Sequence, residues 1–181
     1  ARPMILYLGR LKAYKSIDVL ITSFKILLED IPNALLVIAG SGEEENHLKR
    51  LVNQLGLNDK QILFTGKVSH EEKIKLLQRA WVMVNPSFME GWGITTIEAN
   101  ACGTPVIASD IPGLCDSVKN LQTGYLVKYG DSQAFAEKIK EIMINRGLRI
   151  KMRKESRTWA ENFSWSTSSS RFISIINNNS H

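Results

Sequence analysis

Apolar residues recur along this chain in two alternating patterns, one typical of buried strands and one typical of amphipathic helices. The runs of strand length are Met4–Leu8, Leu35–Ala39, Ile62–Thr65, Trp81–Asn85, Val106–Ala108 and Gly124–Val127. Between most of them apolar residues repeat at helical spacing, and Ser69 with Glu72 forms a capping-box pair before one helix. Strands that are apolar on both faces and alternate with helices favour an α/β fold, a Rossmann-like, doubly wound parallel sheet of six strands.

The chain divides into one long globular segment and a short tail. A length of 181 residues suits a single domain with a substantial core, and we assign residues 1–163 to it. Residues 164–181 begin with a Ser-rich stretch and become apolar again around Phe172, Ile173, Ile175 and Ile176. We expect this tail to be helical, with a packing partner that lies outside this chain.

Composition narrows the cellular setting. No run of residues approaches the length of a membrane span, and the first residues lack the charged-then-apolar shape of a signal peptide. The two cysteines, Cys102 and Cys115, have neither metal-binding nor redox spacing. We therefore expect a protein of the reducing cytoplasm.

Much of the net charge of +5 comes from lysines and arginines between residues 146 and 157. Leu148, Met152, Trp159 and Phe163 repeat at helical spacing through the same stretch, so the basic residues occupy mostly the opposite face. We interpret that face as solvated. The alternative is attraction to an anionic inner membrane surface or to a lipid-diphosphate acceptor. No aromatic residues alternate with a basic strip, so nucleic acid is not an expected partner.

The predicted topology brings two loops together. In a sheet of order 3-2-1-4-5-6, the reversal of direction opens a crevice between the first and fourth strands. The loop after the first strand carries Arg10 and Lys15, and the loop after the fourth is Pro86–Gly93. The helix that begins after Gly93 presents unpaired N–H groups and a partial positive charge. Two cations beside a helix N-terminus predict a site for a diphosphate.

Glu98 is the unusual residue of that helix. On a helical wheel Ile94, Ile97 and Ala101 form an apolar face, and Glu98 falls within it, about 40° from Ile94. A carboxylate turned toward a packed face is costly unless something hydrogen-bonds to it. A ligand diol is one candidate partner. The alternatives are that Glu98 bends outward or pairs with a lysine or arginine that the wheel does not reveal.

Other chemistries find little support. The loop Ala39–Glu45 lacks the third glycine and the Lys-Ser/Thr ending of a phosphate loop, so we interpret it as structural. The three histidines are scattered and pair with no acid or cysteine, so neither a catalytic triad nor a metal site is predicted. Glu90 and Glu98 do not suit a glycosidase acid pair, because Glu98 lies deeper along its helix.

Several motifs together resemble those of a known family. They are Gly9-Arg10-Leu11 with Lys15, the Glu-x7-Glu motif of Glu90 and Glu98, Ala101–Ile107, Gly113-Leu114, Thr123–Val127, Gly130-Asp131 and Phe163-Ser164-Trp165. In this combination the chain resembles the retaining glycosyltransferases of family four. More narrowly, it is similar to the C-terminal, donor-binding half of their two-domain GT-B fold. The resemblance covers nearly the whole chain.

The resemblance implies a role for each matching position. Arg10 and Lys15 would bind the diphosphate of a UDP- or GDP-sugar and stabilise the leaving nucleoside diphosphate. Glu98 would hold the ribose hydroxyls, and the backbone around Lys67, Val68 and Ser69 would bind the base. Glu90 would hold the transferred sugar, together with the turn and helix start formed by Gly91, Trp92, Gly93, Ile94 and Thr95. The resemblance implies no cofactor and no metal, since cationic groups stabilise the leaving group.

The chain also departs from the family pattern. Ser16 stands where many relatives carry glycine, and we expect it to cap the following helix. Cys115 stands where relatives often carry arginine. The resemblance implies a further N-terminal domain that receives a glycan or lipid-linked acceptor and that residues 164–181 contact. We expect this half alone to bind nucleotide and to turn over slowly. The alternatives are a non-catalytic nucleotide-sugar-binding module and a GT-B-type nucleotide-sugar epimerase.

Overall fold

The computed structural model describes residues 2–164, 166, 167, 169 and 173. Within them the strands form one six-stranded sheet in the order β3-β2-β1-β4-β5-β6, and every neighbouring pair is parallel. The strands are β1 (Met4–Leu8), β2 (Leu35–Ala39), β3 (Ile62–Gly66), β4 (Val82–Asn85), β5 (Val106–Ser109) and β6 (Gly124–Val127). The predicted fold class and strand order are confirmed.

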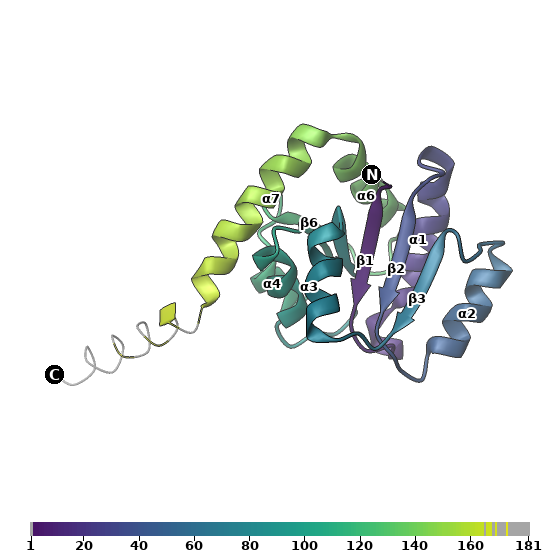
Figure 1. The fold of residues 1–181 in the computed structure, drawn as a ribbon, viewed down its shortest axis with the longest axis horizontal. Helices are drawn as coiled ribbons and strands as arrows, with labels where there is room; N and C mark the ends of the chain where they lie inside the picture. The colour runs from purple at the N-terminus through teal and green to yellow at the C-terminus, as the bar shows by residue number, and fades with distance from the viewer. Residues whose placement is uncertain (1, 165, 168, 170–172, 174–181) are drawn as a thin grey trace.

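Helices follow the strands as the periodicity predicts (Figure 1). The α-helices are α1 (Ile17–Asp30), α2 (Glu45–Gln54), α3 (His70–Arg79), α4 (Ile94–Ala101), α5 (Leu114–Ser117), α6 (Ser132–Ile144) and α7 (Arg146–Ala160). Two short 3-10 turns are η1 (Ala13–Lys15) and η2 (Glu161–Phe163). The capping box at α3 is present, because the Ser69 and Glu72 side chains each bond to the other residue's backbone N–H.

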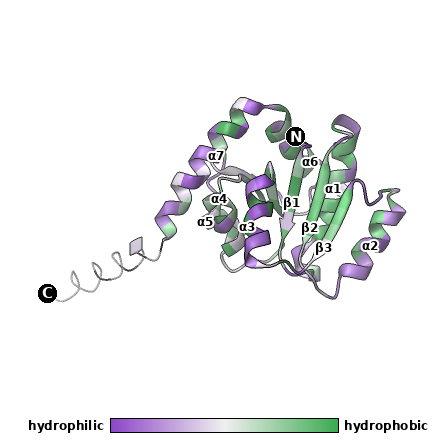
Figure 2. Ribbon diagram, viewed as in Figure 1, coloured by the Kyte–Doolittle hydropathy of each residue, from purple (hydrophilic) through white to green (hydrophobic). Residues whose placement is uncertain are grey.

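Each face of the sheet packs in its own apolar core, although Leu63 of the edge strand β3 is 46% exposed. Ile5 and Tyr7 of β1 belong to a core that includes side chains of α1, α2 and α6. Met4 and Leu6, which alternate with them, belong to a core that includes side chains of α3 and α4. Figure 2 shows β2 and β3 apolar along their length, whereas α2, α3 and α7 alternate apolar and polar positions. Burial on both faces explains why the strand sequences are continuous apolar runs.

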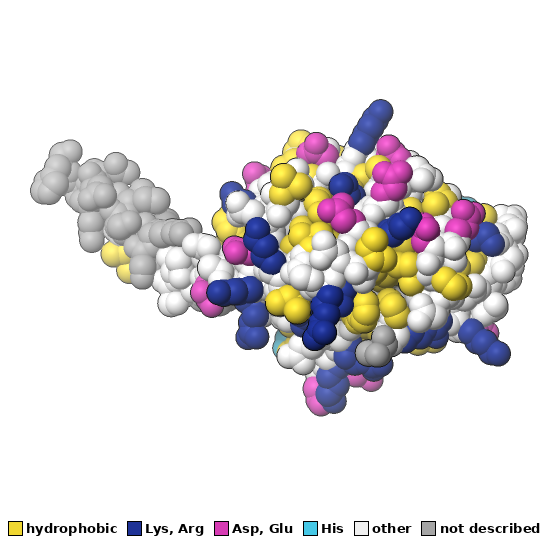
Figure 3. Space-filling model, turned by 90° about the horizontal axis from the view of Figure 1, so that it is seen from above, with side chains coloured by type: hydrophobic (Ala, Val, Ile, Leu, Met, Phe, Trp, Pro, Cys, Tyr) yellow, Lys and Arg dark blue, Asp and Glu magenta, His cyan; other side chains and the backbone are white. Residues whose placement is uncertain are grey.

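The basic face of helix α7 is only partly exposed to solvent, so the interpretation of that face from the sequence is confirmed in part. Lys151 and Lys154 are exposed, but Arg149 lies over the Trp81 ring at 3.8 Å and donates to two backbone carbonyls of α6. Burial and two neighbouring arginines lower the pKa of Arg149. Arg153 likewise donates to the Ala80 carbonyl, at 3.3 Å. On the end of the molecule seen in Figure 3, basic, acidic and apolar side chains are interspersed.

Most of the predicted tail lies outside the described residues. Phe172, Ile175 and Ile176 are among those not described, so the prediction of a helical tail that packs on another domain stays a prediction. Ile173 is described and is 57% exposed. Within the described part of the chain, no helix has both the length and the apolar character needed to span a bilayer.

Candidate functional site

A cleft lies at the carboxyl ends of β1 and β4, where the strand order reverses direction. Two adjoining cavities of about 480 Å³ and about 400 Å³ occupy it, and Leu8, Gly9, Arg10 and Thr95 line both of them. The strands of the sheet point toward the lower end of the molecule in Figure 1, so the cleft opens there. This is the position that the topology predicts for a ligand in a doubly wound sheet.

The loop after β1 is fixed by contacts between main chains. The Gly9 and Leu11 N–H groups donate to the Ala39 and Ser41 carbonyls, each at 3.0 Å. The loops approach so closely that a Cβ on Gly40 would lie 1.8 Å from the Gly9 carbonyl oxygen. The loop after β2, interpreted from sequence as structural, does support the β1 loop in this way. It also borders the larger cavity through Gly40 and Ser41, a contribution that the phosphate-loop test missed.

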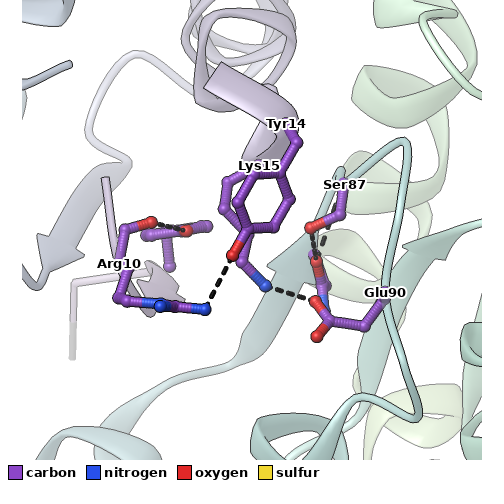
Figure 4. A network of polar contacts seen from close by, with 7 residues as sticks. Arg10, Tyr14, Lys15, Ser87 and Glu90 are labelled. Carbon is purple, nitrogen blue, oxygen red and sulfur yellow. Dashed lines mark hydrogen bonds and ion pairs between the residues drawn. The ribbon is translucent and has the colours of Figure 1, made fainter. Parts of the chain in front are cut away.

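Arg10 and Lys15 both border the smaller cavity (Figure 4). The Arg10 guanidinium donates to the Tyr14 hydroxyl at 2.9 Å, and the Arg10 carbonyl accepts from the Tyr7 hydroxyl at 2.9 Å. Burial first, and the Glu90 charge second, raise the pKa of Tyr7, so its hydroxyl stays a donor. Tyr7 could not be identified from the sequence, because a tyrosine within an apolar strand is typical of a buried core position.

Lys15 and Glu90 form an ion pair across the cleft (Figure 4). Their side chains are only 13% and 19% exposed. The neighbouring Phe88 N–H donates to the Tyr14 carbonyl at 3.0 Å, which holds the loop after β4 against η1. The predicted meeting of Arg10, Lys15 and Glu90 in one crevice is therefore present in the structure.

The turn Gly91–Gly93 leads into α4. Gly93 has φ 71°, a left-handed conformation that strongly favours glycine. A Cβ on Gly113 would lie 2.4 Å from the Glu90 carbonyl oxygen, so the loop after β5 supports the turn from behind. Gly93, Ile94 and Thr95 line the smaller cavity, and the first N–H groups of a helix have no acceptor within it. The helix start is therefore placed to bind an anion.

The helical-wheel prediction for Glu98 is wrong in its premise. The buried residues of α4 are Thr96, Ala99 and Asn100, whereas Ile94 is 68% exposed at the rim of the cleft. The wheel counted only apolar residues, but here polar side chains are buried, and the Asn100 amide donates to the Thr96 carbonyl at 2.7 Å.

Glu98 has a protein partner, as one of the alternatives proposed. The Lys73 ammonium of α3 lies 2.5 Å from one carboxylate oxygen of Glu98, and both residues line the larger cavity. The Glu98 side chain is 34% exposed. Lys73 could not be identified from the sequence, because no pattern within α4 indicates a partner on another helix.

Of the residues predicted to contact a base, Lys67 and Val68 lie at the cleft and Ser69 does not line it. Lys67 and Val68 line the larger cavity, together with Lys73 and Glu98. The Ser69 N–H and hydroxyl are instead engaged in the capping box with Glu72. The backbone bond from Ser69 lowers the pKa of Glu72, which keeps that carboxylate ionised in the cap.

Two departures from the family pattern have local explanations. Ser16 does not cap α1 with its side chain, because its φ of 48° and ψ of 44° are left-handed and an N-cap side chain requires an extended backbone. Its hydroxyl lies 3.3 Å from the Tyr129 hydroxyl instead. The Cys115 thiol donates to an Asp110 carboxylate oxygen at 3.0 Å, and partial burial together with this bond raises its pKa to about 11.

The described residues contain no group of three or more histidine, cysteine or acidic side chains able to hold a metal. The charged side chains that line the cleft are instead the cations Arg10, Lys15, Lys67 and Lys73 and the carboxylates Glu90 and Glu98, each paired with a lysine. The fold and the cleft together define a Rossmann-like α/β domain whose cleft lies at the switch point of the sheet.

The chain belongs to the family described as glycosyl transferases group 1, which matches residues 1–159. An uncharacterized glycosyltransferase of Methanocaldococcus jannaschii is 38% identical over 81% of this chain and 37% of its own length. The D-inositol 3-phosphate glycosyltransferase of Streptomyces avermitilis is 33% identical over 91% of this chain and 37% of its own length. The chain thus spans well under half the length of these curated relatives.

Solved structures agree with this assignment. Sucrose-phosphate synthase of Thermosynechococcus elongatus superposes with a TM-score of 0.88 at 31% identity, covering 98% of this chain and 45% of that one. Anabaena HepE, solved with UDP and glucose, has a TM-score of 0.87 at 21% identity over 98% of this chain and 49% of its own. The structural neighbours are glycosyltransferases of the GT-B fold.

Proposed function

We propose that this chain is the donor-binding half of a retaining GT-B glycosyltransferase that takes a UDP- or GDP-sugar. The observation that carries the proposal is the convergence of Arg10, Lys15, Glu90 and the α4 N-terminus on one cleft, with Glu98 in the adjoining cavity. A nucleoside diphosphate sugar has anionic groups for the cations and helix start, and hydroxyls for the carboxylates. The cleft offers both kinds of partner side by side.

Arg10 and Lys15 would hold the diphosphate and stabilise the charge that develops on the leaving nucleoside diphosphate. Such stabilisation by fixed cations and backbone N–H groups replaces a metal ion, so we expect transfer without one. Lys15 is already placed by its pair with Glu90, which reduces the reorganisation needed when the donor arrives. Glu90 would keep a carboxylate oxygen for the transferred sugar.

The nucleoside would lie in the larger cavity. Glu98 accepts one bond from Lys73, and a carboxylate can accept several, so capacity remains for the ribose hydroxyls. Lys67 and Val68 border the same space and would contact the base. The structure of HepE in complex with UDP-glucose supports this class of ligand for the fold.

The acceptor and the chemistry of transfer are the finer parts of the proposal. Relatives of more than 30% identity include the D-inositol 3-phosphate glycosyltransferase above and a Staphylococcus aureus capsular polysaccharide biosynthesis glycosyltransferase, 34% identical over 86% of this chain and 40% of its own length. We infer hexosyl transfer with retention to a glycan or lipid-linked acceptor. A further N-terminal domain would supply the acceptor site, and the basic face of α7 would permit contact with an anionic membrane.

Calorimetry with UDP-glucose, UDP-N-acetylglucosamine and GDP-mannose tests donor binding by this chain. We expect about 10- to 100-fold weaker binding of the nucleotide sugar in each of three variants, Arg10→Gln, Lys15→Met and Glu98→Gln, because each removes a charged hydrogen-bond partner. Lys151→Met is the control, since Lys151 is exposed on α7. Absence of binding by the unmodified chain, or equal affinities in all variants, would contradict the proposal.

The full-length product of the gene tests the reaction. We expect sugar transfer that persists in EDTA, and a product whose anomeric configuration, assigned by NMR, matches the donor. Glu90→Gln should reduce turnover by at least about 100-fold while donor affinity changes less, because its contact is with the reacting sugar. Epimerised nucleotide sugar without transfer would instead identify an epimerase, and binding without either reaction would identify a binding module.

A further inference from the structure

An aromatic contact joins the turn of the cleft to the end of α7. Trp92, between the two glycines of the turn, lies edge-to-face with Phe163 of η2, with ring centroids 4.9 Å apart and planes at 67°. Phe163 meets Trp159 of α7 in the same way, at 4.8 Å and 82°. We call Trp92, Phe163 and Trp159 the aromatic clasp. Aromatic rings prefer this geometry, so the clasp fixes orientation as well as burying apolar surface.

The outer end of the clasp is anchored to the body of the domain. The Trp159 indole N–H donates to the Ser117 carbonyl of α5 at 3.0 Å. The Lys119 ammonium lies 4.5 Å from the centroid of the Trp159 ring. Helix α7 itself packs along α4, with Met152 and Ser156 buried. These contacts hold Trp159 in one position. Because Phe163 packs against both Trp159 and Trp92, it in turn limits the positions open to the Trp92 ring.

The turn has little rigidity of its own. A Cβ on Gly91 would meet nothing within 4 Å and Gly93 is left-handed, so the two glycines that flank Trp92 permit backbone conformations that other residues would not. Gly113 supports the turn from the α5 side, where its backbone packs against the Glu90 and Gly91 carbonyls. Phe163 is the aromatic support that reaches the turn from α7. Because Glu90 and the first N–H groups of α4 flank this turn, its geometry determines where they point.

We propose that Phe163 is a positioning residue for the diphosphate-sugar part of the donor site, acting through Trp92. The assignment rests on the proposed function. It also predicts a division within the site, because Trp92 lines the smaller cavity but not the larger one that holds Glu98 and Lys67. Loss of the Phe163 ring therefore weakens contacts to the diphosphate and sugar, and leaves contacts to the nucleoside unchanged.

The test compares Phe163→Ala, Phe163→Leu and Phe163→Tyr by calorimetry, with UDP-glucose, UDP and UMP and with GDP-mannose, GDP and GMP. We expect Phe163→Ala to bind the nucleotide sugar and the diphosphate about five- to tenfold more weakly, with the monophosphate within twofold of the unmodified chain. Phe163→Leu, which keeps apolar volume without an aromatic edge, should show the same pattern to a smaller extent. Phe163→Tyr should restore both affinities, because the ring remains.

Tryptophan fluorescence measures the surroundings of Trp92 directly in variants that urea denaturation shows to be folded. The chain has four tryptophans, so the Trp92 signal is taken as the difference between each protein and its Trp92→Phe partner. That signal should shift to longer wavelength in Phe163→Ala and stay unchanged in Phe163→Tyr. Ile150→Ala is the matched control, since Ile150 is an apolar residue of α7 that is 56% exposed.

The outcomes separate the two proposals. Nucleotide-sugar binding that is unchanged in Phe163→Ala, or lost equally for diphosphate and monophosphate, would overturn the role of Phe163 and leave the proposed function standing. Failure of the unmodified chain to bind any of the nucleotides would overturn the proposed function and this assignment with it. Urea denaturation of every variant confirms that each is folded, and Phe163→Leu decides the question if Phe163→Ala does not fold.

Discussion

The β1 side of the cleft is held mainly by contacts between main chains, whereas the β4 side depends on contacts between side chains in addition to the backbone contacts of Phe88 and Gly113. On the β1 side, the loops after β1 and β2 interlock through Gly9, Gly40 and Leu11, with backbone hydrogen bonds of 3.0 Å. On the β4 side, the glycine-flanked turn at Trp92 is held by the Lys15–Glu90 ion pair and the aromatic clasp.

This difference separates two requirements of the site. Backbone interlocking tolerates almost no change, so it fixes where the cations of the β1 loop stand. Side-chain contacts can be exchanged one at a time, so the β4 loop can be tuned to a particular sugar without disturbing the sheet. We therefore expect substitutions of the interlocking glycines on the β1 side to act mainly on stability, and substitutions of the side chains that hold the β4 turn to act mainly on binding.

Gly40→Ala should give the largest effect and tests the β1 side. Its Cβ would lie 1.8 Å from the Gly9 carbonyl oxygen, so the two loops must separate. We expect the free energy of unfolding to fall by at least about 3 kcal/mol, beyond the usual cost of overpacking, because backbone rather than a flexible side chain must move. Urea denaturation followed by circular dichroism measures it.

Gly130→Ala is the matched control for backbone strain. Gly130 has φ 79° but nothing within 4 Å of a built Cβ, so alanine there meets strain without a clash. The expected loss is about 1 kcal/mol. Equal losses at Gly40 and Gly130 would show that backbone conformation, rather than close packing of the loops, accounts for the cost of substitution on the β1 side. That result would contradict the contrast drawn between the two sides of the cleft.

Lys15→Met tests the link between the two sides. Removal of the ammonium leaves the Glu90 carboxylate, 19% exposed, without its partner, so we expect a loss of about 1–3 kcal/mol in stability. Adding Glu90→Gln should recover much of that loss but none of the affinity for a nucleoside diphosphate, because the cation is still absent. Urea denaturation and calorimetry of the single and double variants measure the two effects separately. Recovery of both together would mean that Lys15 serves only as a partner for Glu90.

The comparison also explains what could be predicted from the sequence. Strand runs such as Leu35–Ala39 encode their own burial on both faces, and the alternation with helices then determines the sheet and its switch point. Arg10, Lys15 and Glu90 could be placed together because topology alone brings their loops to one edge. Contacts between distant side chains were not accessible in this way. Neither the Lys73–Glu98 pair nor the Trp92–Phe163 contact leaves a signal in local periodicity.

Helix α4 shows the limit most clearly. Its wheel suggested an apolar face at Ile94, but the helix begins at the rim of the cleft and Ile94 is 68% exposed there. The buried face holds Thr96 and Asn100, which only tertiary packing reveals. Local apolar periodicity is therefore a good guide to the helices that cover the sheet and a poor guide to a short helix that borders a site.

Ser16 provides the smallest and most specific test of the β1 side. It is 4% exposed and left-handed, with φ 48°, at the junction of η1 and α1. Glycine relieves strain of about 1 kcal/mol at such a position, but it adds freedom to the unfolded chain and also loses the contact with the Tyr129 hydroxyl, so we expect Ser16→Gly to be about as stable as the unmodified protein. Ser16→Ala keeps the strain and loses the contact with the Tyr129 hydroxyl, so it should be about 0.5 kcal/mol less stable.

Both Ser16 variants lack the hydroxyl, so the difference between them isolates the backbone. An alanine variant as stable as the glycine variant, measured by urea denaturation, would show that the left-handed turn carries no strain. Close packing of the loops alone would then account for the sensitivity of the β1 side to substitution. A stability difference of the expected sign would instead identify Ser16 as a strained residue on the β1 side, whose strain glycine relieves without altering the neighbouring Lys15.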